Sequence, residues 1–181
     1  MEINSIKQSK YSEIFSMIIH SQHRYGRAAI NRIHQANQHS IDGARALLES
    51  FYYAFNHRKM DVFSKVWAHD ALIQLNNPLG EILRGYEPIA NVYQGIFTGS
   101  ASVWVELSDI VEYQSNDMVV FAGREHGEFT KGEISVPLSI RTSRIIQWLG
   151  SDVGWKQTHH HGSIDDPELL ANYQQAVCGK S

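Results

Sequence analysis

The sequence predicts an α+β domain in which helices pack on one face of a mostly antiparallel sheet. Up to about residue 97, apolar residues recur mainly at helical spacing, whereas from Ser102 onward they recur at every second position in long segments. Helices followed by a run of strands are typical of this class. The length of 181 residues, with 43% hydrophobic and 19% charged residues, fits one domain with a single buried core.

Composition also excludes several classes of function. A formal net charge of -3 argues against a nucleic-acid-binding protein, which normally carries a basic face. Cys178 is the only cysteine, so the sequence predicts no intrachain disulfide and no thiolate metal cluster. The longest N-terminal apolar run, Ile14 to Ile19, is interrupted by Ser16 and is too short for a signal segment or a membrane span. We therefore expect a soluble, cytoplasmic protein with no nucleic-acid or membrane partner.

Residues 1–41 are predicted to form an N-terminal helical extension. Apolar residues from Ser12 to about Gln38 follow an amphipathic helical pattern, which Gly26 interrupts, so one helix or two shorter ones are expected. The helix is expected to cover a neighbouring surface, that of the same chain or of a partner subunit. A helix lying on a membrane surface is the alternative, but its basic residues are few.

Residues 42–164 are predicted to form the main domain. Its expected helices run from Asp42, as N-cap, to about Asn56, and then over 60–67 and 86–97. Between the second and third helices, a turn at Asn76 to Gly80 indicates a β-hairpin of segments 71–75 and 81–84. Long strands follow over 103–113, 118–129, 133–148 and 153–163, and a C-terminal helix is expected within a tail of residues 165–181.

The last strand carries side chains suited to a functional site. Strict alternation places Trp155, His159 and His161 on one face and His160 on the other. We therefore expect His159 and His161 to enter a cleft that they share with Arg144, an arginine within an apolar row of the preceding strand. A one-residue bulge before Thr158 would exchange these faces.

Each of these side chains has two interpretations. Arg144 either binds an anionic ligand or pairs with an inward acid such as Glu106 or Glu125. His159 and His161 are either a general base and its helper or hydrogen-bonded core residues. A His-x-His pair in a strand also suits two metal ligands, but no third ligand lies in register, so no metal is expected.

Several segments together resemble the nuclear-transport-factor-2-like superfamily, in its SnoaL-like and calcium/calmodulin-dependent kinase type II association-domain-like branches. The resemblance covers roughly residues 42–164 and rests on the order of its motifs. Two departures are a hairpin between Arg144 and Trp155 that is two residues longer and the lack of any counterpart to residues 1–41. The matching segments are Phe51-Tyr52-Tyr53-Ala54-Phe55-Asn56, Val66-Trp67-Ala68-His69-Asp70-Ala71, Arg84-Gly85-Tyr86-Glu87-Pro88-Ile89, and Trp155 followed by His159-His160-His161-Gly162-Ser163, with Arg144 and Arg124 as strand arginines.

This resemblance implies a cone-shaped, cystatin-like fold, with three helices on a strongly curved mixed or antiparallel sheet and a pocket between them. It also implies frequent dimerisation through the outer sheet face. We expect a homodimer through this face, because the strand residues Trp104, Val119 and Phe121 would otherwise leave aromatic and aliphatic area in water. The expected site residues are His159 and His161 as catalytic groups, and Arg124, Arg144, Trp67, Tyr52, Tyr93 and Trp155 as ligand-binding groups.

The leading functional hypothesis is a domain whose pocket binds a small anionic or carbonyl-containing molecule, without any cofactor. One alternative is a cofactor-free isomerase, dehydratase or cyclase that uses a pocket histidine as general base. A second alternative is a protein-association module, because this cone-shaped fold serves both enzymes and binding proteins.

Overall fold

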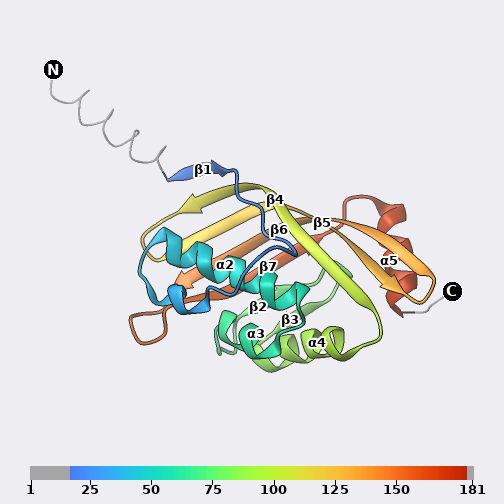
Figure 1. Ribbon diagram of the computed structural model, residues 1–181, viewed down its shortest axis with the longest axis horizontal. Coiled ribbons are helices and arrows are strands. Elements are labelled where there is room, and N and C mark those ends of the chain that lie inside the picture. The colour runs from blue at the N-terminus through green and yellow to red at the C-terminus, as the bar shows by residue number, and fades with distance from the viewer. Residues whose placement is uncertain (1–16, 179–181) are drawn as a thin grey trace, which may run out of the picture.

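Seven strands form one mixed sheet in the computed structural model, which describes residues 17–178 (Figure 1). The order across the sheet is β1-β4-β5-β6-β7-β2-β3, and only β2 and β7 pair in parallel. The α+β class and the mixed sheet are therefore confirmed. The strands are β1 (Ile18–Ser21), β2 (Gln74–Asn76), β3 (Ile82–Arg84), β4 (Ser102–Gln114), β5 (Met118–Lys131), β6 (Ile134–Trp148) and β7 (Trp155–Ser163).

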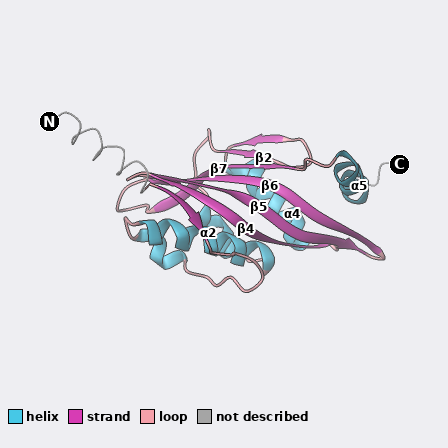
Figure 2. Ribbon diagram, turned by 90° about the horizontal axis from the view of Figure 1, so that it is seen from above, coloured by secondary structure: helices cyan, strands magenta, loops and turns pink. Residues whose placement is uncertain are grey.

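The helices lie on one face of this sheet and at one end of it. Figure 2 shows α2 against the concave face of the long strands and α5 at their far end. Helix α2 begins after Ser40, whose side chain accepts a hydrogen bond from the backbone N–H of Gly43 at 3.2 Å, so Ser40 rather than Asp42 is the N-cap. The helices are η1 (a 3-10 helix, Ile33–Asn37), α2 (Ile41–Asn56), α3 (Met60–Val66), α4 (Tyr86–Thr98) and α5 (Pro167–Cys178).

The prediction of an α-helix from Ser12 to Gln38 is wrong for residues 17–38. Residues 12–16 lie outside the part of the chain that the structure describes. Residues 17–38, here called the strap, contain β1, turns and the 3-10 helix η1 in place of an α-helix. Strand β1 pairs with β4, and Tyr25 exchanges backbone hydrogen bonds with Leu107 at 3.0 and 2.9 Å. Gly26 permits this close approach, since a Cβ there would lie 2.7 Å from a carboxylate oxygen of Glu106. Tertiary pairing thus overrides a moderate helical pattern.

Bulges in two strands change which side chains face the helices. In β4 the register shifts between Ser108 and Val111, where Asp109 has a positive φ of 52°. Ile110 and Glu112 consequently turn inward, and both are fully buried. A second shift lies in β7, because Ile145 pairs with His159 while Ile146 pairs with Gln157. An extra residue at this point reverses the alternation for the rest of the strand.

Strand β6 extends beyond its neighbour β7. The pairing of β6 with β7 starts at Arg141, so in the described part of the chain residues 134–140 have a strand partner only on the β5 side. Pro137 fits this edge, because proline cannot donate a ladder hydrogen bond. Helix α5 covers the end of the sheet, with Tyr173 packed on Phe129 at 5.6 Å between ring centroids and Ala176 buried.

The core fills the space between α2 and the concave face, here called the inner face. Val119 and Phe121 are 1% and 0% exposed and belong to this core, so the expectation that they form an outer dimer face is wrong. Of that set, Trp104 lies on the outer face, where Arg27 covers its ring at 4.2 Å. None of the helices in residues 17–178 is long and apolar enough to cross a membrane.

Candidate functional site

Arg144 is the centre of a buried polar cluster on the inner face. It is 1% exposed, and its guanidinium donates hydrogen bonds to Glu125 Oε1 at 2.8 Å, to the Tyr52 hydroxyl at 3.0 Å and to Gln157 Oε1 at 3.1 Å. Tyr52 donates in turn to Glu125 Oε1 at 2.5 Å. Of the two interpretations of Arg144, the structure supports pairing with an inward acid. Tyr52, Glu125, Arg144, Gln157 and His160 are called the arginine cluster below.

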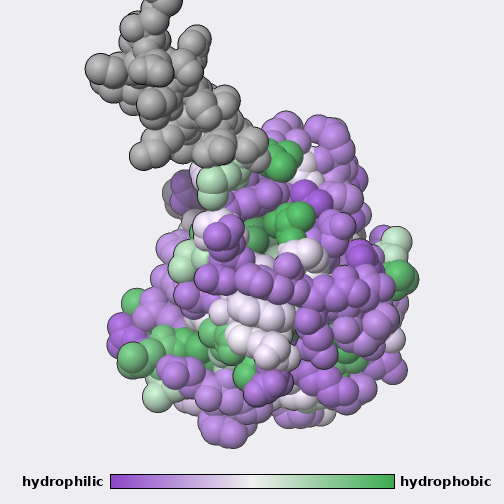
Figure 3. Space-filling model, turned by 90° about the vertical axis from the view of Figure 1, so that its left-hand side faces the viewer, coloured by the Kyte–Doolittle hydropathy of each residue, from purple (hydrophilic) through white to green (hydrophobic). Residues whose placement is uncertain are grey.

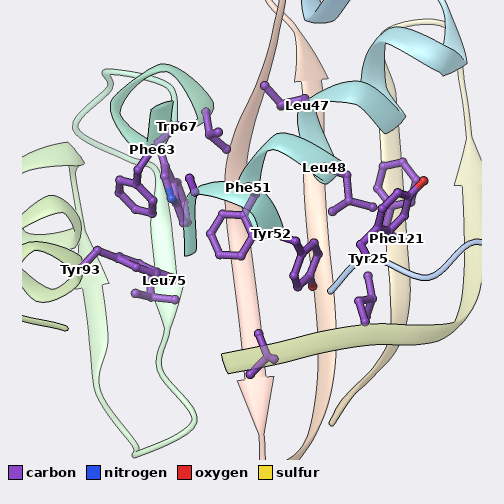
Figure 4. Packing of buried hydrophobic residues seen from close by; sticks show 14 of the residues in the cluster. Tyr25, Leu47, Leu48, Phe51, Tyr52, Phe63, Trp67, Leu75, Tyr93 and Phe121 are labelled. Carbon is purple, nitrogen blue, oxygen red and sulfur yellow. The ribbon is translucent and has the colours of Figure 1, made fainter. Parts of the chain in front are cut away.

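Four elements bring these side chains together. Glu125, Arg144, Gln157 and His160 stand on the inner faces of β5, β6 and β7, and Tyr52 reaches them from the buried stripe of α2. The guanidinium of Arg144 also lies 3.7 Å from the ring centroid of Phe51, a cation–π distance. In Figure 4, Phe51 and Tyr52 occupy the middle of the core between the aromatic group around Trp67 and the rings of Tyr25 and Phe121.

His160 is the histidine that joins the cluster, and the prediction that His159 and His161 enter the cleft is wrong. The bulge at Thr158 reverses the alternation, so His160 is 5% exposed and directly opposite Arg144 in the ladder. His159 faces outward beside Gln74 in the register of β2. His161 is exposed on the same outer side, where its Nδ1 lies 3.2 Å from the Asn76 amide nitrogen.

The other predicted ligand-binding residues divide between the cluster and the rest of the fold. Trp67 is fully buried and forms a bridge with Gln157, and the buried Tyr93 packs edge-on against Phe51, so both border the cluster. Trp155 is buried away from the cluster, next to the strap. Its indole nitrogen donates a hydrogen bond to the Gln38 carbonyl at the end of the strap.

The prediction that Arg124 lies in the pocket is also wrong. Arg124 has the opposite parity to Glu125 on β5, so it projects from the outer face. There it donates to Ser139 at 3.1 Å and lies 3.4 Å from Asp165. Hydrogen bonding to Arg124 lowers the pKa of Asp165. This pair joins the outer face to the start of α5.

Burial determines the protonation states around Arg144. Burial lowers the pKa of His160 well below its usual value, and the charge of Arg144 lowers it further, so the imidazole is neutral at pH 7. Burial likewise raises the pKa of Tyr52 and of Tyr93, which keeps both phenols protonated. Burial alone would lower the pKa of Arg144, but Tyr52 and Glu125 more than offset this, so the guanidinium remains charged.

Several polar atoms in the cluster and next to it have no hydrogen-bond partner among the described residues. His160 lies opposite Arg144, Thr142 is two residues from it on the same face of β6, and Gln157 is bonded to it. The strand residues among them therefore occupy neighbouring positions on the inner face, roughly 5–8 Å apart. These atoms are Trp67 Nε1, Thr142 Oγ1, Gln157 Nε2, and Nδ1 and Nε2 of His160.

Two tyrosines from other elements lie next to the cluster. Tyr25 of the strap is 5% exposed and stacks on Tyr52 at 6.2 Å. Tyr173 of α5 packs on Phe129, and burial together with the nearby charge of Glu125 raises its pKa to about 12. Among described residues, the hydrogen bond from α5 to the rest of the fold runs from Gln174 to the Leu79 carbonyl. The strap, by contrast, is held by paired backbone hydrogen bonds and by ion pairs of Arg24 with Glu106 and Arg32 with Glu49.

Residues 17–178 contain no group of three or more His, Cys, Asp or Glu side chains suited to holding a metal ion. The histidines of β7 illustrate why. His160 points inward while its two neighbours point outward, so the three imidazoles cannot converge.

Comparison with known families identifies the domain. A model of the SnoaL-like domain matches residues 44–167, which is more than half of the chain. The chain belongs to the SnoaL-like domain family. Every residue of the arginine cluster lies inside the matched region. A search of curated proteins found no match.

Solved structures support the same superfamily. A candidate calcium/calmodulin-dependent protein kinase type II association domain from Thiobacillus denitrificans is 26% identical, with a TM-score of 0.54 over 67% of this chain and 94% of that one. A candidate dehydratase of the NTF2-like family from Streptomyces avermitilis is 16% identical, with a TM-score of 0.60 over 68% and 94% of the two chains. A Caulobacter vibrioides protein with a cystatin-like fold is 17% identical, with a TM-score of 0.56 over 76% and 97%. The last two similarities concern the fold alone.

Proposed function

We propose that the arginine cluster of this SnoaL-like domain binds a small molecule through a carbonyl or carboxylate oxygen. The observation that carries the proposal is the set of unpartnered buried atoms around Arg144. A buried polar group without a partner costs about 1–3 kcal/mol, and native proteins seldom leave several together. The free N–H groups of Trp67 and Gln157 are donors for such an oxygen. The route of ligand entry that we propose is displacement of α5, because Tyr173 of this helix lies near Glu125 of the cluster.

A ligand screen on matched variants tests this proposal. Small amides, ketones and carboxylic acids are added to the protein, and binding is measured by thermal shift and calorimetry. Trp67→Phe removes one donor while keeping an aromatic ring, so it should weaken binding about 2–10-fold, the value of one hydrogen bond. Trp148→Phe, outside the cluster, should leave the affinity unchanged. If no compound shifts the melting temperature, or if both variants bind like the wild type, the cluster is not the binding site.

A second candidate function is cofactor-free catalysis with His160 as general base, in place of the histidines expected from the sequence. The supporting observation is that both ring nitrogens of the neutral His160 are unpartnered, whereas Glu125 is engaged by Arg144 and Tyr52. Proton exchange at the α-carbon of bound ketones, followed by NMR in deuterated buffer, would detect this chemistry. His160→Gln should abolish the exchange and retain binding, and exchange that persists in the variant would exclude His160 as the base.

Self-association through the outer face of the sheet is a separate proposal. The row formed by Tyr113, Val120 and Ile145 is apolar and crosses β4, β5 and β6. Tyr113 is 46% exposed and the adjacent Met118 38%. The 26% identical structure named an association domain supports the idea. Figure 3, which views another side, shows hydrophobic patches broken up by hydrophilic surface.

Sedimentation velocity at micromolar concentration measures this association. We expect a dimer of the 20.6 kDa chain, and a monomer for Val120→Arg, because an arginine in an apolar interface would be buried without a partner. Lys131→Arg, at the exposed end of β5, is the control that should remain dimeric. A monomeric wild type would refute the proposal.

A further inference from the structure

We infer that the arginine cluster selects uncharged ligands, such as primary amides, over carboxylates of the same shape. This inference rests on the proposed function and names the ligand class of that site. It narrows the anionic or carbonyl ligand that the sequence alone predicts to the uncharged carbonyl class.

The charge balance of the cluster is the first observation. Arg144 and Glu125 form an ion pair at 2.8 Å, and their side chains are 1% and 4% exposed. Tyr52 and Gln157 occupy two further directions of the guanidinium, and Tyr52 also bonds the carboxylate. The positive charge of Arg144 is therefore already neutralised inside the protein. A carboxylate ligand would add an ion without a counter-ion, and such a charge is costly to bury.

The neighbouring titratable groups do not change this balance. His160 is neutral at pH 7, and the phenols of Tyr52, Tyr93 and Tyr173 keep their protons. The other inner-face carboxylate, Glu112, is paired with Arg45 at 2.8 Å. A ligand anion would thus find no unpaired cation among the inner-face groups that the structure describes.

The unpartnered atoms form the second, independent observation. Trp67 Nε1 and Gln157 Nε2 are donors, the Thr142 hydroxyl can donate or accept, and a neutral His160 has one donor and one acceptor nitrogen. A primary amide has both a carbonyl acceptor and an N–H₂ donor, so it complements this mixture. A carboxylate only accepts hydrogen bonds, so it would leave the acceptor nitrogen of His160 without a partner.

Matched amide and carboxylate pairs test the inference. Acetamide with acetate, isobutyramide with isobutyrate, and benzamide with benzoate differ in charge but hardly in shape. In ligand-observed NMR titrations at pH 7.5, we expect the preferred amide to have a Kd at least tenfold lower than that of its carboxylate. A carboxylate that binds more tightly than its amide would overturn the inference while leaving the proposed function standing. If neither class binds, the proposed function fails as well.

Two variants locate the source of the selectivity. Glu125→Gln keeps the shape of the side chain but removes the charge that balances Arg144, so the preference should reverse toward the carboxylate. Glu112→Gln removes a buried charge that is paired with Arg45 instead, and it should keep the wild-type preference. Reversal in both variants, or in neither, would contradict the role given to Glu125.

A measurement on the wild type covers the case in which Glu125→Gln does not fold. If the cluster admits only uncharged ligands, benzoate binds as benzoic acid and takes up one proton. Calorimetry in two buffers of different ionisation enthalpy should then show the uptake of one proton per benzoate and none per benzamide. Benzoate binding without proton uptake would overturn the inference.

Discussion

Arg144 and His160 stand directly opposite each other on the inner faces of β6 and β7. A permanent cation is thereby placed beside a buried imidazole, and together with burial it keeps that imidazole neutral. The bulge at Thr158 creates this pairing. Without the extra residue, Arg144 would have His159 or His161 as its neighbour on the inner face.

The lowered pKa of His160 predicts a loss of stability in mild acid. The unfolded chain binds a proton at His160 near the usual pKa of about 6.5, whereas the folded protein resists it, so the free energy of unfolding falls as the pH drops below about 6.5. From pH 7.5 to 5.5, urea titrations should show the wild type losing about 1 kcal/mol more than His160→Gln. His126 is exposed, so the free energy of unfolding of His126→Gln should fall as much as that of the wild type over this pH range. Equal losses in all three proteins would contradict the assignment.

The Arg144–Glu125 pair predicts a strongly non-additive mutant cycle. Glu125→Leu leaves a buried guanidinium unpaired and should destabilise the fold by about 3–5 kcal/mol. Combining it with Arg144→Met should recover most of this loss, because the double variant buries no charge. Glu106→Leu removes a more exposed pair with Arg24 and should cost less than about 1 kcal/mol. Additive effects in urea unfolding would argue against the pairing.

The burial of Tyr25 predicts that the strap contributes to the stability of the fold. Its ring is 5% exposed and stacks on Tyr52, so Tyr25→Ala should cost about 3 kcal/mol by leaving a cavity. Tyr25→Phe keeps the ring and should change the free energy of unfolding by less than about 1 kcal/mol. An alanine variant as stable as the phenylalanine variant would show that the strap contributes little to packing.

Because α5 makes few polar contacts with the rest of the described residues, we predict that small molecules reach the cluster by displacing this helix. Thr142→Cys in a Cys178→Ser background places a thiol next to the cluster, at a position 4% exposed, and its reaction with iodoacetamide reports opening. Tyr173→Ala should accelerate this reaction at least tenfold, and Tyr173→Phe should change it little. A control thiol, Ser50→Cys, lies buried beneath the strap, and it should react at the same slow rate with Tyr173 and with Tyr173→Ala. Acceleration at both thiols would indicate general unfolding instead.

Sequence patterns predicted the fold better than they predicted the site. The order of elements, the inward direction of Arg144 and its possible pairing with Glu125 could be read from alternation and from the rarity of unpaired buried arginine. His160 was missed because a bulge depends on tertiary pairing, and parity is lost after a single inserted residue. The strap was missed because strand pairing and Tyr25 determine its conformation.

The unpaired start of β6 has a consequence for the solution behaviour of the protein. Residues 134–140 offer backbone groups on the side away from β5, next to the apolar side chains of Ile134, Val136 and Leu138. Without α5, such an apolar edge would be a template for pairing with another chain. Helix α5 therefore protects against aggregation, and Pro137 adds to the protection, because it removes one donor from the middle of the edge.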